Sequence, residues 1–319
     1  MLRSQKNPAR TAYRRGVNSE LLPQMQLALL LGIFLTRSVS VQPQTLEVSN
    51  SSGLQIAVDS EDRNPALVVA VPDGPESDRT SKILFPEHVT VRAHGQSEQQ
   101  HLYIFRPGKN GDSPRWTRVG NAIEYSSDFE KIHFVARATL VADGIVFRYE
   151  FGNGSAIDYD VATAITDPRF HGVFYDARLE RTYVHHTDGF ELLASETPAR
   201  LTMPLKDWFP VRYLASYTAS VPTELVQRRD DGITYRYKSR RVDVPMVATL
   251  SVDRTWIAAS FARAPGNVWS NPELTCQHVD PEVSLPHGGR GVYEMKILIF
   301  KGSLDDALRK VVVQRTTLK

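Results

Sequence analysis

Short stretches of alternating or wholly apolar residues, typical of β-strands, recur along most of the chain. Three times, two such stretches flank an Asp-Gly dipeptide, at Asp143-Gly144, Asp188-Gly189 and Asp231-Gly232. Asp-Gly suits the positive φ angles of a type I′ turn, so each pair of stretches predicts a β-hairpin. We predict further strands at Leu54–Val58, Ala66–Val71, Met246–Val252, Trp256–Phe261 and Val292–Phe300. Many strands joined by hairpins, with no helices between them, predict antiparallel sheets.

The clearest helical signal lies close to the last residue. Ser303 suits an N-cap, Asp306 stands where a capping box needs its partner, and the apolar residues that follow fall on one stripe. We therefore predict an all-β fold, a large antiparallel β-sandwich that ends in one helix at about residues 303–314.

The first forty residues have the layout of an export signal. Basic residues precede an apolar run, Gln26–Leu35, which is too short to span a bilayer comfortably. Ser38-Val39-Ser40 offers small residues to a signal peptidase, so we expect cleavage after Ser40. This predicts a signal peptide at 1–40, a single β-sandwich domain at 41–319, and a periplasmic or secreted protein. The alternative is an N-terminal helix that anchors the protein to a membrane.

Charge and cysteine content narrow the classes of partner. The net charge is +2, and several of the basic residues lie in the N-terminal segment. Removing that segment leaves a chain close to neutral, which excludes charge-driven nucleic-acid binding. We also expect no membrane contact after signal removal. The single cysteine, Cys276, excludes an internal disulfide.

The segment Trp269–Pro281 concentrates the chemically capable residues of the chain. If Thr275–Asp280 is extended, alternation places Cys276, His278 and Asp280 on one face. These side chains are of types that bind metals, but residues two apart on a strand are separated by about 6.5–7 Å. We therefore predict neither a metal nor a cofactor.

His278 is the candidate acid or base, with Asp280 orienting its ring. The alternative is a buried histidine bonded to the backbone, with Asp280 holding a turn before Pro281. Trp269 and Asn271 suit sugar recognition, because sugars stack their C–H faces on aromatic rings and bond to amides through hydroxyl groups. Equally, Trp269 suits the closure of one end of the sandwich.

Three further residues are candidate ligand contacts. Arg178 and Arg181 lie close to aromatic residues and suit a carboxylate, as in an acidic sugar. The alternative for both is a solvated strand position, with Glu180 as a local ion-pair partner. His186 neighbours His185 just before the Asp188-Gly189 turn, so at most one of the two histidines faces any given cleft.

Two motifs support a family resemblance. The pattern G-N-V-W-x-N-P-x-x-x-C-x-H-x-D-P starts at Gly266, and after a strand G-S-L-D-D-A-L starts at Gly302. With the segments Asp167–Phe170 and Arg178–Gly189, they resemble exported bacterial proteins related to galactose-mutarotase-like β-supersandwich domains, over roughly residues 130–312. The His and Glu that serve as acid and base in aldose epimerases have no legible counterpart here.

The resemblance implies a supersandwich fold and a carbohydrate ligand. We therefore expect an exported carbohydrate-recognising protein that either only binds its ligand or acts on it through His278. The competing hypothesis is a structural or assembly protein of the cell envelope, in which Trp269–Pro281 only stabilises the fold.

Overall fold

The computed structural model describes residues 46–59, 62, 64–72, 79–102, 104–105, 114–195, 211–216, 227–230, 233–265, 268–270 and 275–319, with the backbone alone over 211–239. All of them belong to one compact unit that extends from Gln44 to Lys319. The predicted signal peptide lies outside the described residues. In the part of the chain that the structure describes, no helix is long and apolar enough to cross a membrane.

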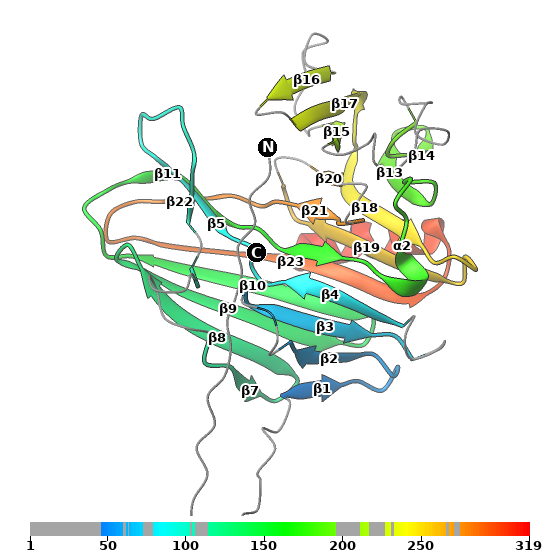
Figure 1. Cartoon of the computed structure of the whole chain (residues 1–319), viewed down its shortest axis with the longest axis horizontal. Helices are drawn as coiled ribbons and strands as arrows, with labels where there is room; N and C mark the ends of the chain where they lie inside the picture. The colour runs from blue at the N-terminus through cyan, green and yellow to red at the C-terminus, as the bar shows by residue number, and fades with distance from the viewer. Residues whose placement is uncertain are drawn as a thin grey trace, which may run out of the picture. The chain divides into compact units, whose positions relative to one another are not determined.

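The largest sheet has nine strands, all of them antiparallel to their neighbours (Figure 1). In spatial order they are β14 (Gly189–Leu192), β13 (Thr182–His186), β18 (Val244–Leu250), β19 (Trp256–Ala262), β23 (Arg290–Lys301), β10 (Gly144–Asn153), β9 (Ile132–Val141), β8 (Ala122–Phe129) and β7 (Thr117–Val119). The predicted strands at 246–252, 256–261 and 292–300 are β18, β19 and β23, with ends shifted by two residues or fewer.

Three smaller sheets accompany the large one. The first contains β1 (Glu47–Ser49), β2 (Gln55–Val58), β3 (Ala66–Ala70), β4 (Thr80–Leu84) and β12 (Asp167–Arg169). The second contains β22 (Val283–Leu285), β11 (Tyr159–Ala164), β5 (Val89–Ala93) and β6 (Gln100–Leu102). The third contains β16 (Gln227–Asp230), β17 (Ile233–Arg241), β15 (Val211–Ser216), β20 (Val268–Ser270) and β21 (His278–Val279), in which β15 and β17 are parallel. Single 3₁₀ turns occur at η2 (Gly172–Phe174) and η5 (Arg315–Thr317).

Two of the three predicted hairpins are described in full. The turn Ala142-Asp143 joins β9 to β10 and the turn Thr187-Asp188 joins β13 to β14, so in each case the predicted glycine is the first residue of the second strand. Gly144 and Gly189 have positive φ angles, of 153° and 126°, but the turn residues before them do not, so the hairpins are as predicted and the predicted type I′ turns are wrong. The third pair, β16 with β17, is antiparallel as predicted, but its Asp231-Gly232 turn lies outside the described residues.

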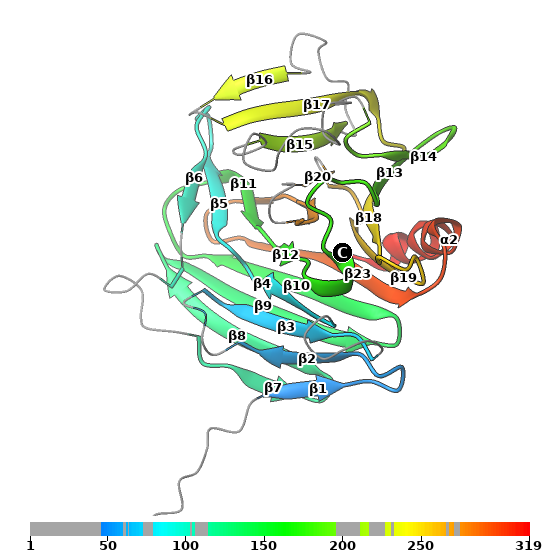
Figure 2. The ribbon, with the colours of Figure 1, turned by 45° about the vertical axis from the view of Figure 1, so that its right-hand side comes forward.

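The core lies between the large sheet and the smaller sheets. Alternate residues of β9 are buried, which explains its alternating sequence: Ile132, Phe134, Ala136, Ala138 and Leu140. Strands β18 and β19 are buried on both faces, because the second face packs against the helix α2 (Leu304–Gln314) through Ala307 and Val311 (Figure 2). The fold is therefore the predicted all-β sandwich, and α2 is the one α-helix among the described residues.

The predicted capping box of α2 is present. Ser303 Oγ accepts from the backbone N–H of Asp306, and Asp306 accepts in turn from the backbone N–H of Ser303. Asp143, at the β9–β10 turn, fixes the helix to the sheet. Its carboxylate accepts from Lys296 on β23 at 2.5 Å and from Lys310 and Gln314 on α2 at 3.0 and 2.9 Å.

Candidate functional site

Trp269 and His278 form a stacked pair on neighbouring short strands. They are direct cross-strand partners on β20 and β21. Their ring centroids are 3.7 Å apart and their planes are inclined by 5°. His278 is only 2% exposed, so the indole covers one face of an imidazole that solvent hardly reaches.

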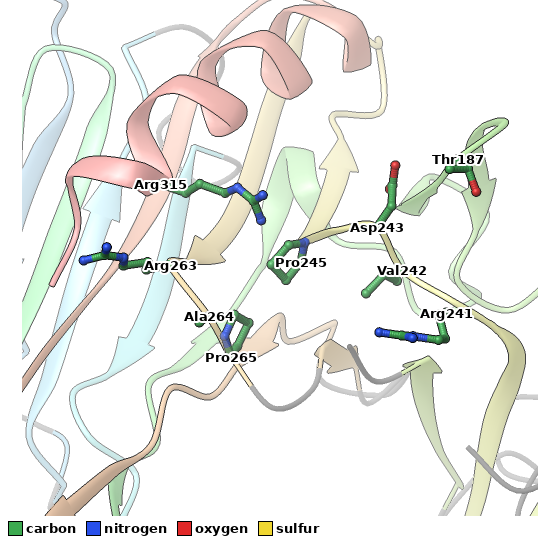
Figure 3. Close-up of a pocket in the computed structure, with 9 residues that line it drawn as sticks. All are labelled: Thr187, Arg241, Val242, Asp243, Pro245, Arg263, Ala264, Pro265 and Arg315. Carbon is green, nitrogen blue, oxygen red and sulfur yellow. The ribbon is translucent and has the colours of Figure 1, made fainter. Parts of the chain in front are cut away.

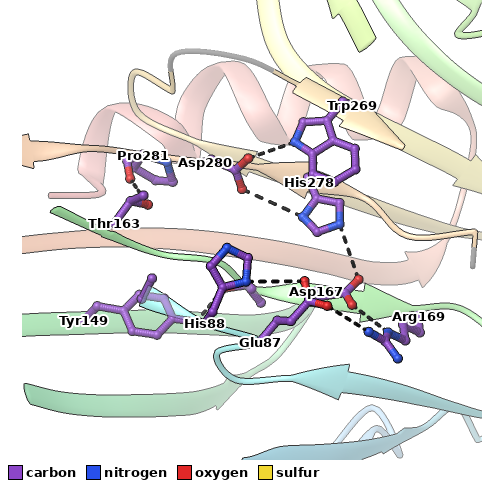
Figure 4. A network of polar contacts seen from close by, with 12 residues as sticks. Glu87, His88, Tyr149, Thr163, Asp167, Arg169, Trp269, His278, Asp280 and Pro281 are labelled. Carbon is purple, nitrogen blue, oxygen red and sulfur yellow. Dashed lines mark hydrogen bonds and ion pairs between the residues drawn. The ribbon is translucent and has the colours of Figure 1, made fainter. Parts of the chain in front are cut away.

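Asp280 follows β21 and contacts both rings (Figure 4). Trp269 Nε1 donates to Asp280 Oδ2 at 2.9 Å, and His278 Nδ1 lies 3.9 Å from Asp280 Oδ1. The Asp280 side chain is 12% exposed. Burial raises the pKa of Asp280 above its ordinary value, although the attraction of His278 and the bond from Trp269 act in the opposite direction.

Asp167 meets the other nitrogen of the same imidazole. It begins β12, in a different sheet, and its Oδ1 lies 3.4 Å from His278 Nε2. Arg169 Nε donates to Asp167 Oδ2 at 2.6 Å, while its terminal nitrogen donates to Glu87 Oε1 at 3.1 Å. His278 therefore lies between two carboxylates, and Arg169 links the inner one to Glu87 (Figure 4).

The ionisation of the inner group follows from these contacts. Burial opposes a positive charge on His278, but Cys276 and Asp167 outweigh it and hold the pKa of His278 well above its ordinary value. Burial likewise opposes a negative charge on Asp167, yet His278 and Arg169 keep the pKa of Asp167 below its ordinary value. The contacts with His278 and Arg169 thus favour a charged Asp167 in spite of its burial.

Trp269 and Asp280 line a cavity of about 390 Å³. The other walls come from the turn before β5, from β5 and β6, from β11 and from the residue after Pro281: Glu87, His88, Thr90, Gln99, His101, Thr163, Ile165 and Glu282. The His88 and His101 rings meet edge to face at 4.6 Å, and His101 Nδ1 is 2.8 Å from Thr90 Oγ1. The cavity therefore offers three carboxylates, two imidazoles, hydroxyl groups and an indole.

The proposed common face of Cys276, His278 and Asp280 is only partly what the structure shows. Only His278–Val279 is a strand, and Thr275 has a positive φ of 46°. Cys276 and His278 side chains do gather, but their third partner is Asp167, and Asp280 lies on the opposite edge of the imidazole. Asp280 lines the cavity, whereas His278 does not.

The other predicted ligand contacts do not line this cavity. His186 is 1% exposed, with Nδ1 2.6 Å from the carbonyl oxygen of Arg241 and Nε2 3.4 Å from Glu191. Arg181 donates to the carbonyl oxygens of Leu250 and Tyr175. Their geometry indicates structural roles.

Arg178 is exposed and is absent from the lining of the cavity. Asn271 lies outside the described residues.

Three groups of the site were missed by sequence reasoning. Asp167-Pro168 reads first as a turn, so nothing local indicated that Asp167 reaches His278. Glu87 and His88 carry no motif and reach the cavity only through the pairing of β5 with β11. Glu282 had one usable signal, since it directly follows the segment Trp269–Pro281.

A larger cavity, of about 540 Å³, has a different character. It lies between the end of β17, the end of β19 and η5, and no aromatic residue is among the described residues that line it. Arg241 and Arg315 point into it, while Arg263 points away (Figure 3). Without a stacking surface or a carboxylate pair facing inward, this cavity is the weaker candidate for sugar binding.

Two solved structures resemble the chain at the level of the fold. A galactose mutarotase related enzyme from Lactobacillus acidophilus aligns over 82% of this chain and 99% of its own, with a TM-score of 0.46 and 10% identity. A protein from Synechocystis aligns over 82% of this chain and 97% of its own, with a TM-score of 0.44 and 9% identity. No protein-family model and no curated protein matches the sequence.

Proposed function

We propose that the cavity beside Trp269 binds a carbohydrate. The observation that carries the proposal is the meeting of an indole, three carboxylates and two imidazoles at one cavity of about 390 Å³. Ligand cavities commonly fall between about 300 and 1,000 Å³ and place a few polar groups around an apolar surface. Sugar hydroxyl groups donate to carboxylates and imidazoles, and sugar C–H faces pack on indoles.

The charges of the cavity favour neutral or amino sugars over acidic ones. Glu87, Asp280 and Glu282 contribute carboxylates. Arg169 is bonded to Asp167 and Glu87, and neither Arg178 nor Arg181 lines the cavity. A sugar carboxylate would therefore lie beside acidic side chains, and no arginine is among the described residues that line the cavity. The proposed class of ligand is therefore narrower than the one expected from the sequence, which also included acidic sugars.

Asp280 is the better placed group for an acid or base step on a bound sugar. It lines the cavity, while His278 is 2% exposed and lies behind Trp269. A general acid or base must come within hydrogen-bond reach of the proton that it transfers. We infer that His278 positions Asp280 and Trp269 from behind. This reverses the two roles that the sequence suggested.

One observation favours the alternative function, a purely structural protein of the cell envelope. Gln277 is fully buried and bonds through its amide to Ser260, Thr249 and the carbonyl oxygen of Ala258. This part of the segment therefore stabilises the fold. Gln277 does not line the cavity, so its role does not compete with sugar binding by Trp269 and Asp280.

Thermal unfolding with a panel of neutral, amino and acidic sugars tests the proposal. A sugar that binds only the folded protein raises the midpoint of unfolding. We expect a shift with a neutral or amino sugar and none with an acidic one. Trp269→Ala and Glu87→Gln should remove the shift, and Arg241→Gln, in the larger cavity, should keep it. A shift that persists in both cavity variants would contradict the assignment.

We also propose that the protein is exported, on the sequence pattern of residues 26–40. Sequencing the N-terminus of the protein recovered from outside the cytoplasm tests this. A mature chain that starts at Val41 is the expected result, and a full-length chain held in the membrane fraction would favour the anchor instead.

A further inference from the structure

Three metal-ligating side chains meet behind the wall of the cavity. Asp167, Cys276 and His278 each offer one ligand atom, and these atoms all lie within 4.8 Å of one another. They come from two segments that an isolated β-bridge between Arg169 and Cys276 holds together. All three residues are buried, with exposures of 1, 1 and 2%. None of them lines the cavity described above.

The polar atoms of this cluster are incompletely bonded. Asp167 Oδ1 and His278 Nδ1 are buried and have no hydrogen-bond partner among the described residues. A buried polar atom without a partner costs about 1–3 kcal/mol and calls for an explanation, such as a bound ion. Arg169 occupies only Asp167 Oδ2, which leaves Oδ1 directed at His278 Nε2, 3.4 Å away.

We propose that Asp167, Cys276 and His278 bind a divalent transition-metal ion such as Zn²⁺. Thiolate, imidazole and carboxylate are the three ligand types that zinc combines, whereas magnesium and calcium take oxygen ligands. Ligand atoms around tetrahedral zinc lie about 3.3–3.8 Å apart, given bond lengths of about 2.0–2.3 Å. The cluster therefore needs to contract by only about 1 Å at its widest.

The surroundings of the cluster supply the outer contacts that such a site requires. With His278 Nε2 as ligand, Nδ1 faces Asp280 Oδ1 across 3.9 Å, which is longer than a hydrogen bond, so a small shift on metal binding would complete the order carboxylate, histidine, metal. Arg169 fixes the ligand carboxylate from its far side at 2.6 Å. A thiolate and the Asp167 carboxylate together balance the two positive charges of the ion. The sequence pointed to Cys276 and His278 as side chains of metal-binding types but not to the third ligand, because Asp167 lies on β12, far along the chain.

Cobalt titration of the purified protein, kept reduced without a thiol reagent, tests the proposal. A thiolate bound to Co²⁺ gives a charge-transfer absorption in the near ultraviolet. Cys276 is the only cysteine of the chain, so this band can arise only there. We expect the band to saturate at one equivalent of Co²⁺ and to disappear when Zn²⁺ displaces it. If the folded wild-type protein does not develop the band, this titration alone overturns the proposal.

Two variants locate the ion. Cys276→Ala should abolish the band and weaken Co²⁺ binding at least tenfold. His94→Ala is the matched control, because His94 pairs with Asp160 at 2.8 Å on the surface and should leave both readouts unchanged. One-equivalent binding that survives Cys276→Ala at full affinity would place the ion elsewhere and refute the site.

The same protein separates this proposal from sugar binding. A sugar-induced shift in EDTA, with no cobalt band, would refute the metal site and leave the proposed function intact. A cobalt band with no response to any sugar would refute the proposed function and leave the metal site intact.

Discussion

Replacing Trp269 by Phe separates the two contacts that the indole makes. A phenyl ring can still stack on His278, but the N–H that donates to Asp280 at 2.9 Å is lost. A hydrogen bond to a charged group contributes about 1.5–3 kcal/mol, and Asp280, at 12% exposure, has little access to water as a replacement. We therefore expect a coupling energy of about 1.5–3 kcal/mol between Trp269 and Asp280.

Urea unfolding of four proteins measures this coupling. They are the wild type, Trp269→Phe, Asp280→Ala and the double variant, all in EDTA so that a bound metal does not contribute. The double variant should be less destabilised than the sum of the two single variants by the coupling energy. Trp256→Phe combined with Asp280→Ala is the matched control and should be additive, since Trp256 lies on β19 and contacts Lys301 instead. Additivity within about 0.5 kcal/mol for Trp269 and Asp280 would refute the inference that the indole holds this carboxylate.

Three further predictions concern the helix, the hairpins and the cavity. The bonds from Lys296, Gln314 and Lys310 outweigh the burial of Asp143 and lower its pKa from 3.8 to about 2, which corresponds to about 2 kcal/mol of stability. Because the pKa is lower in the folded state, the free energy of unfolding of the wild type should exceed that of Asp143→Asn by this amount above pH 4, and the difference should disappear as the pH falls through about 2. Urea unfolding across this pH range measures it, and an equal difference at pH 1.5 and pH 7 would contradict the prediction. Gly144→Ala should lower the free energy of unfolding by at least about 2 kcal/mol more than Gly189→Ala does. A Cβ at 144 would lie 2.0 Å from the carbonyl oxygen of Ile297, whereas one at 189 meets nothing within 4 Å. Similar losses in the two variants would refute the close packing of β10 on β23. Glu87→Gln should weaken sugar binding in calorimetry at least tenfold with little change in the unfolding midpoint, and unchanged affinity would remove Glu87 from the site.

Local signals in the sequence were sufficient to predict most of the fold. The Asp-Gly dipeptides marked the positions of the β9–β10 and β13–β14 hairpins, although each glycine is the first residue of the second strand and the turns are not of type I′. Ser303 and Asp306 likewise marked the start of α2 within the chain itself. The assembly of β12 beside β4, or of β5 beside β11, depends on pairings between distant segments that no local pattern encodes.

The same distinction explains what was found and missed at the site. Trp269, His278 and Asp280 lie within one short segment, so their proximity could be predicted, although alternation alone does not say which face is interior. The interior position of His278 decides the roles of the two residues, because it buries the imidazole and leaves Asp280 to line the cavity. Asp167 comes from another sheet and Glu87 from the turn between β4 and β5, and only the tertiary structure brings them to the imidazole and to the cavity.

Isothermal titration of the purified protein with neutral and amino sugars tests the central claim most directly. We predict saturable binding of at least one such sugar at a single site, weakened at least tenfold in a folded Trp269→Ala protein and unchanged in Arg241→Gln. Equal affinity in the wild type and Trp269→Ala, or no binding of any sugar by the folded protein, would contradict the assignment of this cavity as a carbohydrate site.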